Sequence, residues 1–488
     1  MPKSVAAALV FACSAAVLVL EILASRLLAP YVGVSLDTYT AVIGTILAGI
    51  AAGAWLGGLA ADRIDPRRLL GPLVVAGGGL ALFTVPVVRG LGDASGQGGS
   101  TATVFLALAG FFLPAAVLSS VTPIVAKLQL QDLGKTGGVF GRLSGIGTLG
   151  ALVGTFVTGF LLVARAPTRG VIFGLGATLV LAGIGLWVWL SRRDAAVLSC
   201  LAIATVGTGG LAVVVDDPCQ IESAYYCMRV EHDPARASGR ILWLDDLRHS
   251  YVDLDDPSYL EFDYLKSVHD VVEVALPDQP IDALFIGGGG FTLPRALAAE
   301  RPGTRTIVLE IDPAVVDLAE DELGLETSEA LEVRVGDARI GIRNAPTDGF
   351  DLVVGDAFAS LSVPWHLTTR EFLDEVRRVL RPDGVYVVNV IDYPPFRFAR
   401  AELATFRAQF DFVAVIGSPF QLDRGVGGNL VLVAADDPAN TAALEALVAE
   451  HGDTVLVGAA LDAFIGSAPE LTDDYAPVDQ WLVRDRPA

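Results

Sequence analysis

The chain has 488 residues, of which 52% are hydrophobic and 18% charged, with a mean hydropathy of +0.54. An average soluble protein is less apolar and has a charged share of about 25%, so this composition excludes a purely soluble chain of ordinary type. The formal net charge of −22 also argues against a nucleic-acid-binding protein, because phosphate recognition requires a basic surface.

Charge is divided unevenly along the chain. Residues 1–215 contain 13 Lys or Arg and seven Asp or Glu, which leaves 21 basic and 49 acidic residues for 216–488. The net charge is therefore +6 in the first part and −28 in the second. We expect two physically different regions. The acidity of the second region favours solubility and the attraction of cationic substrates.

The first region contains apolar runs that are each close to the ~20 residues needed for a helix to cross a bilayer. They lie at 5–24, 40–60, 69–88, 102–126, 145–164, 170–190 and 195–215. Residues 1–215 are therefore predicted to form a multi-span α-helical membrane domain of about seven helices. The four-residue spacing of Gly49, Gly53 and Gly57 predicts close helix packing. Glu21, an acid within the first run, leaves a role in proton or cation coupling open beside a structural one.

Lysines and arginines predict the orientation of these helices. In a seven-span arrangement the richer side carries Lys3, Arg63, Arg67, Arg68, Lys127, Lys135, Arg142, Arg192 and Arg193. The other side carries Arg26, Arg89, Arg165 and Arg169. The richer side should be cytoplasmic, which would put the second region outside the cytoplasm. Cys219 and Cys227 suit a hairpin disulfide, and disulfides persist in oxidising compartments.

Short strands and helices alternate in the second region. Strands are expected at 282–286, 305–310, 331–335, 350–355 and 384–391, and helices at 293–300, 313–323 and 368–380. This alternation predicts a parallel, doubly wound, Rossmann-like α/β domain over residues 271–488. Before it, residues 216–270 are expected to form a small β-rich subdomain.

Candidate ligand-binding residues follow the predicted strands, at the strand ends where doubly wound sheets bind ligands. The glycine run at 287–290 lacks Cβ atoms and permits close approach of a ligand to the backbone. Glu310 ends the second strand, where an acid can accept both ribose hydroxyls. Asp337 and Asp356 follow the third and fourth strands. The run does not fit G-x-G-x-x-G and Pro294 removes a helix N–H, so a nucleoside without pyrophosphate is favoured.

The motifs IGGGG, LEIDP, VGDAR, VVGDAF and LTDDYAPVD together resemble those of the spermidine synthase family in its membrane-fused form. The resemblance covers about Tyr225 to Trp481 and implies a class I methyltransferase-like fold. It further implies a membrane-anchored transferase that moves an aminopropyl group from decarboxylated S-adenosylmethionine to a polyamine such as putrescine. The implied partners are a small cationic amine and the lipid bilayer, with a homodimer as one option, no nucleic acid and no metal.

The resemblance also implies roles for individual residues. The cofactor would be bound by Gly287, Gly288, Gly289, Glu310, Asp337 and Ala338. Within that set Glu310 would hold the ribose and Asp337 the adenine amino group. Asp356 would be the catalytic base, which takes a proton from the attacking amine. A sulfonium carbon needs only a deprotonated amine in line with it, so positioning and one general base suffice.

On the acceptor side, the resemblance implies that Tyr259 and Glu261 line the amine site. His366 lies just past Asp356, in the loop expected to cover the acceptor, and is the histidine that we expect to be functional.

The sequence departs from the family pattern at several positions. Gly290 stands where the glycine run usually contains an acid, and Ala359 stands where the second acid of the D-x-x-D-P loop would be. Leu260 and His249 replace common polar partners of the amine.

These departures leave two alternatives open. One is an S-adenosylmethionine-dependent methyltransferase, or another transferase with a different acceptor. The other is a non-catalytic transporter or sensor that binds a nucleoside or polyamine. Because both forms of the cofactor are made in the cytosol, cofactor supply favours a cytoplasmic second region, against the charge count and the cysteines.

Overall fold

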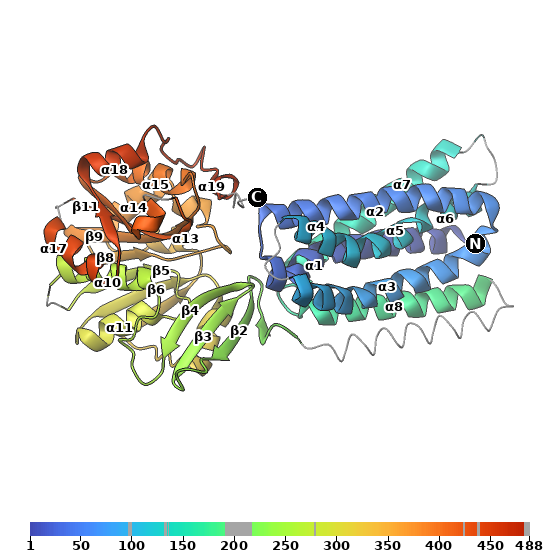
Figure 1. Ribbon diagram of the computed structural model, residues 1–488. Helices are drawn as coiled ribbons and strands as arrows, with labels where there is room; N and C mark the ends of the chain where they lie inside the picture. Colours follow the sequence, from blue (N-terminus) through green and yellow to red (C-terminus); the bar gives the residue numbers. More distant parts are fainter. Residues whose placement is uncertain are drawn as a thin grey trace. The chain divides into compact units, whose positions relative to one another are not determined.

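The computed structural model describes residues 1–95, 100–130, 134, 136–190, 217–277, 280–422, 425–436 and 440–482. The chain divides into two compact units, Met1–Cys227 and Met228–Ala488. Figure 1 shows long helices in the first unit and, in the second, a sheet flanked by helices.

The helices of the first unit follow the predicted apolar runs. They are α1 (Lys3–Val32), α2 (Leu36–Arg63), α3 (Pro66–Ser95), α4 (Ser100–Ala107), α5 (Leu113–Ser119), α6 (Val121–Gln129), α7 (Thr136–Val157) and α8 (Thr168–Leu190), with π-helical segments η1 (Leu108–Phe112) and η3 (Thr158–Leu162). Within the described residues, six helical stretches are long and apolar enough to cross a membrane. The predicted multi-span helical region is confirmed for these residues, whereas the run at 195–215 lies outside them.

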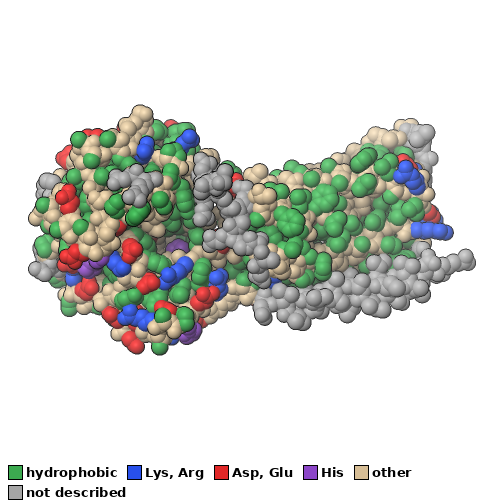
Figure 2. Space-filling view, in the orientation of Figure 1, with side chains coloured by type: hydrophobic (Ala, Val, Ile, Leu, Met, Phe, Trp, Pro, Cys, Tyr) green, Lys and Arg blue, Asp and Glu red, His purple; other side chains and the backbone are tan. Residues whose placement is uncertain are grey.

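Glycines allow these helices to approach closely. A Cβ added to Gly53 of α2 would lie 2.0 Å from the carbonyl oxygen of Ala116 in α5, and one added to Gly150 of α7 would lie 2.3 Å from that of Phe11 in α1. No side chain fits at either position. On the outside, Trp55 and Phe160 are 70% and 79% exposed, and Figure 2 shows hydrophobic side chains along this unit. Such a surface is suited to lipid.

A small sheet has the order β1-β2-β3-β4 and comprises β1 (Ile221–Glu222), β2 (Cys227–His232), β3 (Gly239–Leu244) and β4 (Leu247–Asp253). Strand β3 is antiparallel to both β2 and β4. Cys219 and Cys227 form a disulfide, as their spacing suggested.

The large sheet has the order β12-β10-β11-β9-β8-β5-β6-β7. Its strands are β5 (Asp282–Ile286), β6 (Arg305–Glu310), β7 (Leu331–Val335), β8 (Phe350–Gly355), β9 (Leu380–Asp392), β10 (Phe412–Gly417), β11 (Gly428–Ala435) and β12 (Thr454–Leu456). Strands β5 to β9 are parallel, as predicted. Beyond β9, where the sequence analysis predicted no strands, β11 pairs antiparallel with both β9 and β10. The β10–β11 connection is shorter than the dozen or more residues of a parallel crossover.

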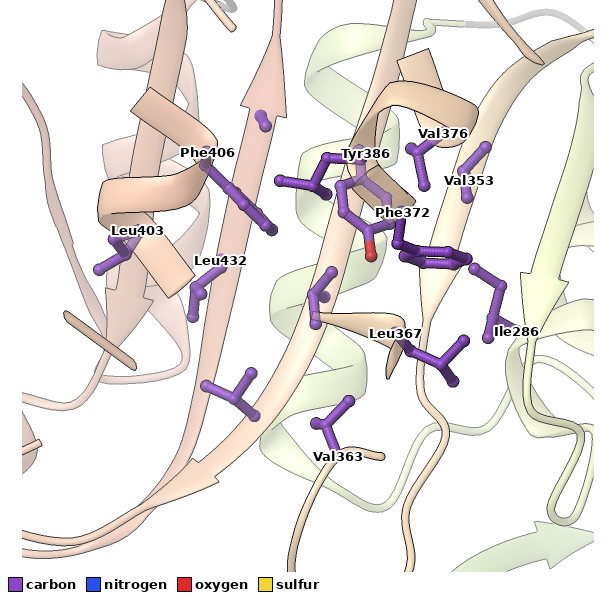
Figure 3. Close-up of a cluster of buried hydrophobic side chains, with 14 of the residues drawn as sticks. Ile286, Val353, Val363, Leu367, Phe372, Val376, Tyr386, Leu403, Phe406 and Leu432 are labelled. Carbon is purple, nitrogen blue, oxygen red and sulfur yellow. The ribbon is translucent and has the colours of Figure 1, made fainter. Parts of the chain in front are cut away.

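Helices cover both faces of the large sheet. They are α10 (Asp263–Ala275), α11 (Thr292–Glu300), α12 (Pro313–Glu322), α13 (Ala338–Arg343), α14 (Arg370–Val379), α15 (Arg397–Arg407), α16 (Pro419–Leu422), α17 (Thr441–Glu450), α18 (Gly458–Ile465) and α19 (Val478–Trp481), with a 3-10 turn η4 (Trp365–Leu367). Helices α13, α14, α15 and α18 share one apolar core, part of which Figure 3 shows around Tyr386, Phe372 and Phe406. Helix α10 packs against α17 and β11.

The strand order fixes where a ligand can bind. Strand β5 lies between β6, which follows it in sequence, and β8. The order therefore reverses at β5, and the carboxyl ends of β5 and β8 form the switch point at which open α/β sheets bind ligands.

Candidate functional site

The glycine loop after β5 is pressed against the end of β8. Gly287 and Gly289 have φ angles of +97° and +50°, which favour glycine. A Cβ added to Gly287 would lie 2.5 Å from the carbonyl oxygen of Asp356, and one added to Gly288 would lie 2.5 Å from the Phe291 ring. The loop therefore excludes side chains, and a ligand that approaches it meets backbone.

Glu310 holds this loop from the end of β6. Its Oε2 accepts a hydrogen bond from the Gly288 N–H at 2.8 Å, and its Oε1 accepts one from the Asp312 N–H at 2.9 Å. Burial raises the pKa of Glu310, and these backbone hydrogen bonds act against the rise. Glu310 therefore holds the glycine loop to the end of β6.

Asp337 lies at the start of α13, beyond β7. Its Oδ1 accepts a hydrogen bond from the Arg339 N–H at 2.8 Å, which caps the helix. The other oxygen, Oδ2, lies 3.5 Å from Nε2 of His366. Ala338 is buried as the first residue of the helix. The structure thus places His366 beside Asp337, the residue expected to hold adenine.

Asp356 is half-buried at the end of β8 and has two hydrogen-bond donors. The Asn389 Nδ2 donates to its Oδ1 at 2.9 Å, and the Tyr264 hydroxyl donates to its Oδ2 at 3.0 Å. Burial raises the pKa of Asp356 to about 6, while both hydrogen bonds act to lower it. Asn429 donates to Oδ1 of Asn389 at 2.9 Å, which turns the Asn389 amide nitrogen toward Asp356.

Sequence analysis did not identify Tyr264, Asn389 or Asn429. Asn389 could have been identified from the sequence, because it is the one polar amide in the apolar stretch VYVVNVI of β9. Tyr264 lies five residues after the tyrosine that was selected, in the first turn of α10. Asn429 pairs with the central strand only through the antiparallel β9–β11 register, which the sequence did not predict.

A cavity of about 470 Å³ lies beside Asp356. Its wall combines carboxylates, amides and apolar side chains. They include Glu261, Asp263, Asp356, Asp453, Asn389, Gln421, Asn429, Phe262, Tyr264, Phe358, Ile391, Ile416 and Val431. This mixture suits a small molecule with both charged and apolar parts.

Tyr259 and Glu261 differ in their access to this cavity. Glu261 lies in its wall and forms a salt bridge with Arg248 at 3.3 Å. The Tyr259 hydroxyl donates to Glu261 at 2.6 Å, and its ring packs 3.8 Å from the Arg236 guanidinium. Glu261 therefore lines the cavity, whereas Tyr259 contacts Glu261 and is not among the residues that line the cavity.

His249 also lies in the cavity wall, with its ring edge toward Phe358. Burial lowers the pKa of His249 to about 4, so its imidazole is neutral at pH 7. Its Nδ1 is buried and has no hydrogen-bond partner within the part of the chain that the structure describes. This nitrogen faces the glycine loop, since a Cβ added to Gly289 would lie 3.3 Å from it.

Of the two departures in the acid motifs, the one at Gly290 has a structural explanation. A Cβ added to Gly290 would lie 2.8 Å from Cβ of Ser250 on β4, whose Oγ accepts a hydrogen bond from the Gly290 N–H at 3.0 Å. An acid at this position would require β4 to move. Ala359 forms a tight turn, since its N–H donates to the Ser362 carbonyl at 2.7 Å. Within the described ranges, no group of three or more His, Cys, Asp or Glu residues could hold a metal ion.

Comparisons with known proteins agree with this architecture. A family model described as a methyltransferase domain matches residues 269–388. The polyamine aminopropyltransferase of Vibrio vulnificus is 37% identical over 134 residues, which are 27% of this chain and 44% of that protein. Polyamine aminopropyltransferase 2 of Streptomyces coelicolor is 27% identical over 437 residues, 82% of this chain and 76% of that protein.

Among solved structures, a probable spermidine synthase from Corynebacterium glutamicum is 25% identical, with a TM-score of 0.49, and covers 52% of this chain and 95% of that one. The alignment with the Vibrio relative spans less than half the length of that protein. Together the sequence matches support a cofactor of the S-adenosylmethionine type for the second unit.

Proposed function

We propose that this protein is a membrane-anchored aminopropyltransferase, because its second unit is a spermidine synthase-like domain and a multi-span helical region precedes that unit. It would transfer the aminopropyl group of decarboxylated S-adenosylmethionine to an amine. The observation that carries the proposal is the position of Asp356. The backbone of Asp356 lies against the glycine loop, and its side chain lies in the cavity wall.

The nucleoside would bind at the carboxyl ends of β5, β6 and β7. Gly287, Gly288 and Gly289 would face it with backbone alone, since added side chains have no room or no suitable backbone angle. Glu310 would accept the ribose hydroxyls, and Asp337 with Ala338 would bind the adenine edge. Both acids have the free acceptor capacity that this requires.

Asp356 would act as the general base. The lone pair of the acceptor nitrogen forms a bond to the carbon next to the sulfonium. The carbon–sulfur bond breaks, and its electron pair stays on sulfur as a neutral thioether. The nitrogen becomes more acidic as its new bond forms and gives one proton to Asp356. A carboxyl with a pKa of about 6 is mostly ionised at pH 7 and sits close to the operating pH, as efficient proton transfer requires.

The test is product analysis by mass spectrometry. Full-length protein in detergent is given decarboxylated S-adenosylmethionine, or S-adenosylmethionine, with a panel of diamines and polyamines. We expect an aminopropyl adduct that is lost in Asp356→Asn and retained in Asp321→Asn, which removes an exposed acid on α12. An Asp356→Asn protein with full turnover would refute the role of this base.

A methyltransferase is the second candidate, favoured by Gly290 and Ala359. The chain lacks acids at both places where the family pattern has them, and the matching family model is described as a methyltransferase domain. In the same assay this alternative predicts a methyl adduct with S-adenosylmethionine and no aminopropyl adduct.

The side of the membrane is also part of the proposal. Glu222 forms a salt bridge with Arg26 at 2.8 Å and accepts a hydrogen bond from the Thr168 N–H at 2.9 Å. Asp217 forms a salt bridge with Arg89 at 2.8 Å. Residues 217–222 are therefore fixed to the end of the helical unit that has fewer Lys and Arg. The positive-inside rule and the Cys219–Cys227 disulfide together favour an extracytoplasmic exit for this segment.

Thiol labelling in intact cells tests that assignment. A membrane-impermeant maleimide should label Cys219 and Cys227 only after a membrane-impermeant reductant has opened their disulfide. Labelling that requires membrane permeabilisation would put the segment in the cytoplasm, where the donor nucleoside is made.

A further inference from the structure

Asp453 faces the same cavity as Asp356 but comes from a different part of the fold. It follows α17, in a turn closed by the hydrogen bond from its N–H to the Val448 carbonyl at 3.0 Å. Gly452, with a φ of +84°, allows this turn. The Asp453 side chain is half-buried in the cavity wall. Its position is thus fixed by the backbone and directed toward the site.

One face of α10 links the two carboxylates. Tyr264 and Ser267 are three residues apart and lie on the same side of the helix. The Tyr264 hydroxyl donates to Asp356 at 3.0 Å, and the Ser267 hydroxyl donates to Asp453 at 2.8 Å. The helix therefore sets a fixed separation between Asp356 and Asp453.

The carboxylates in the cavity wall differ in what compensates their charge. Glu261 is paired with Arg248 at 3.3 Å, and Asp263 is paired with Lys266 at 2.8 Å. The hydrogen-bond partner of Asp453 is a neutral hydroxyl. Burial raises the pKa of Asp453 and the nearby Asp263 raises it further, while the Ser267 hydroxyl and His451 act to lower it. A partly buried carboxylate in this setting gains most from a cationic ligand.

The rest of the cavity fits an alkyl chain with nitrogen at its ends. Ile391, Ile416 and Val431 offer apolar contact for methylene carbons. His249 also lies in the cavity wall. Its pKa near 4 keeps the imidazole neutral, so it does not repel a cation.

We propose that Asp453 binds a second, protonated nitrogen of the acceptor while Asp356 faces the nitrogen that reacts. The inference rests on the proposed function and narrows the acceptor to a diamine or longer polyamine. It also offers a replacement for the acid missing at Ala359, since Asp453 supplies negative charge from the loop between α17 and β12. Asp453 is then a specificity-determining residue that contacts the substrate.

The test compares 1,4-diaminobutane with 1-aminobutane, which has the same carbon chain and lacks the second nitrogen. Calorimetry would measure the affinity of each amine for full-length protein in detergent. The protein would first be saturated with the thioether nucleoside that the proposed reaction leaves as a product. We expect the wild type to bind the diamine about 10- to 100-fold more tightly, as for a charge-assisted hydrogen bond. Asp453→Asn should remove that preference and leave nucleoside affinity unchanged.

Asparagine at 453 can still accept the hydrogen bond from Ser267, so the variant should fold. Asp453→Glu, which keeps the charge, should retain part of the preference. The matched control is Glu445→Gln, which removes an exposed carboxylate from α17 and should behave as wild type.

Turnover separates this inference from the proposed function. A diamine preference that depends on Asp453, in a protein that makes no aminopropyl product, would refute the transferase and keep the binding site. Aminopropyl transfer with equal affinity for both amines, or a preference unchanged in Asp453→Asn, would overturn the role of Asp453 and keep the transferase.

Discussion

The two sides of the proposed site are built in different ways. On the nucleoside side, the glycine loop, Glu310 and Asp337 each follow directly from a parallel strand, so local sequence motifs describe the whole arrangement. On the acceptor side, Tyr264 comes from α10, Asn389 from within β9 and Asp453 from the loop after α17. The nucleoside side is therefore local in sequence, and the acceptor side depends on long-range packing. If this division is functional, substitutions on one side should leave the other side intact.

Asp356→Asn should have the largest effect on catalysis. Loss of a general base typically lowers the rate by about 10²- to 10⁴-fold. Its backbone contacts with the glycine loop do not depend on the side chain, so nucleoside affinity should stay within about twofold of wild type. Single-turnover kinetics and nucleoside calorimetry would measure the two effects. A matching loss of nucleoside affinity would show that the two sides are not separable.

Glu310→Gln should have the next largest effect, on the opposite side. The amide nitrogen would face backbone N–H groups from which Glu310 now accepts hydrogen bonds, such as those of Gly288 and Asp312. Losing such a charged acceptor should weaken nucleoside binding by about 10- to 100-fold. The affinity for 1,4-diaminobutane should change little. The exposed Glu329→Gln provides a control, and unchanged nucleoside affinity in Glu310→Gln would exclude the ribose assignment.

Gly290→Ala tests why the nucleoside side lacks the family acid. The new Cβ would lie 2.8 Å from that of Ser250, so overpacking should destabilise the second unit by about 1–3 kcal/mol. Thermal unfolding in detergent would report a lower midpoint. In a Ser250→Gly background the obstructing Cβ is gone, and the added cost should shrink. An equal cost in both backgrounds would mean that the close approach of β4 is not the cause.

The same division explains which features the sequence could predict. Strands 282–286, 305–310, 331–335 and 350–355 have the predicted bounds, because short apolar runs between helices define parallel strands well. The sequence comparisons confirm the resemblance to the spermidine synthase family. Most of the motifs on which that resemblance rests lie at the ends of these strands.

The acceptor side could not be predicted in this way. Asp453 lies 97 residues beyond Asp356, and nothing in its local sequence HGDT distinguishes it from a surface loop. It reaches the cavity because α17 packs against α10. The antiparallel pairing of β9 with β11, which brings Asn429 to Asn389, likewise joins strands that are not consecutive in sequence. Residues brought together by tertiary packing leave little trace in the periodicity of a single sequence.

Asn389→Ala should produce the smallest effect, visible mainly in the pH profile. In the wild type, kcat/KM should fall as the pH drops through about 6, because protonated Asp356 cannot accept a proton. The Asn389 hydrogen bond favours the charged carboxylate and lowers its pKa. Its removal should therefore raise the pKa of Asp356 and shift the acid limb of the profile to higher pH, with little change on the alkaline plateau.

Asn429→Ala should shift the acid limb in the same direction by less, since Asn429 acts through Asn389, and the exposed Asn344→Ala should not shift it. A uniform loss of activity at every pH would make Asn389 merely structural. A shift confined to the acid limb, with nucleoside affinity preserved, would show that residues remote in sequence tune the base from the acceptor side alone.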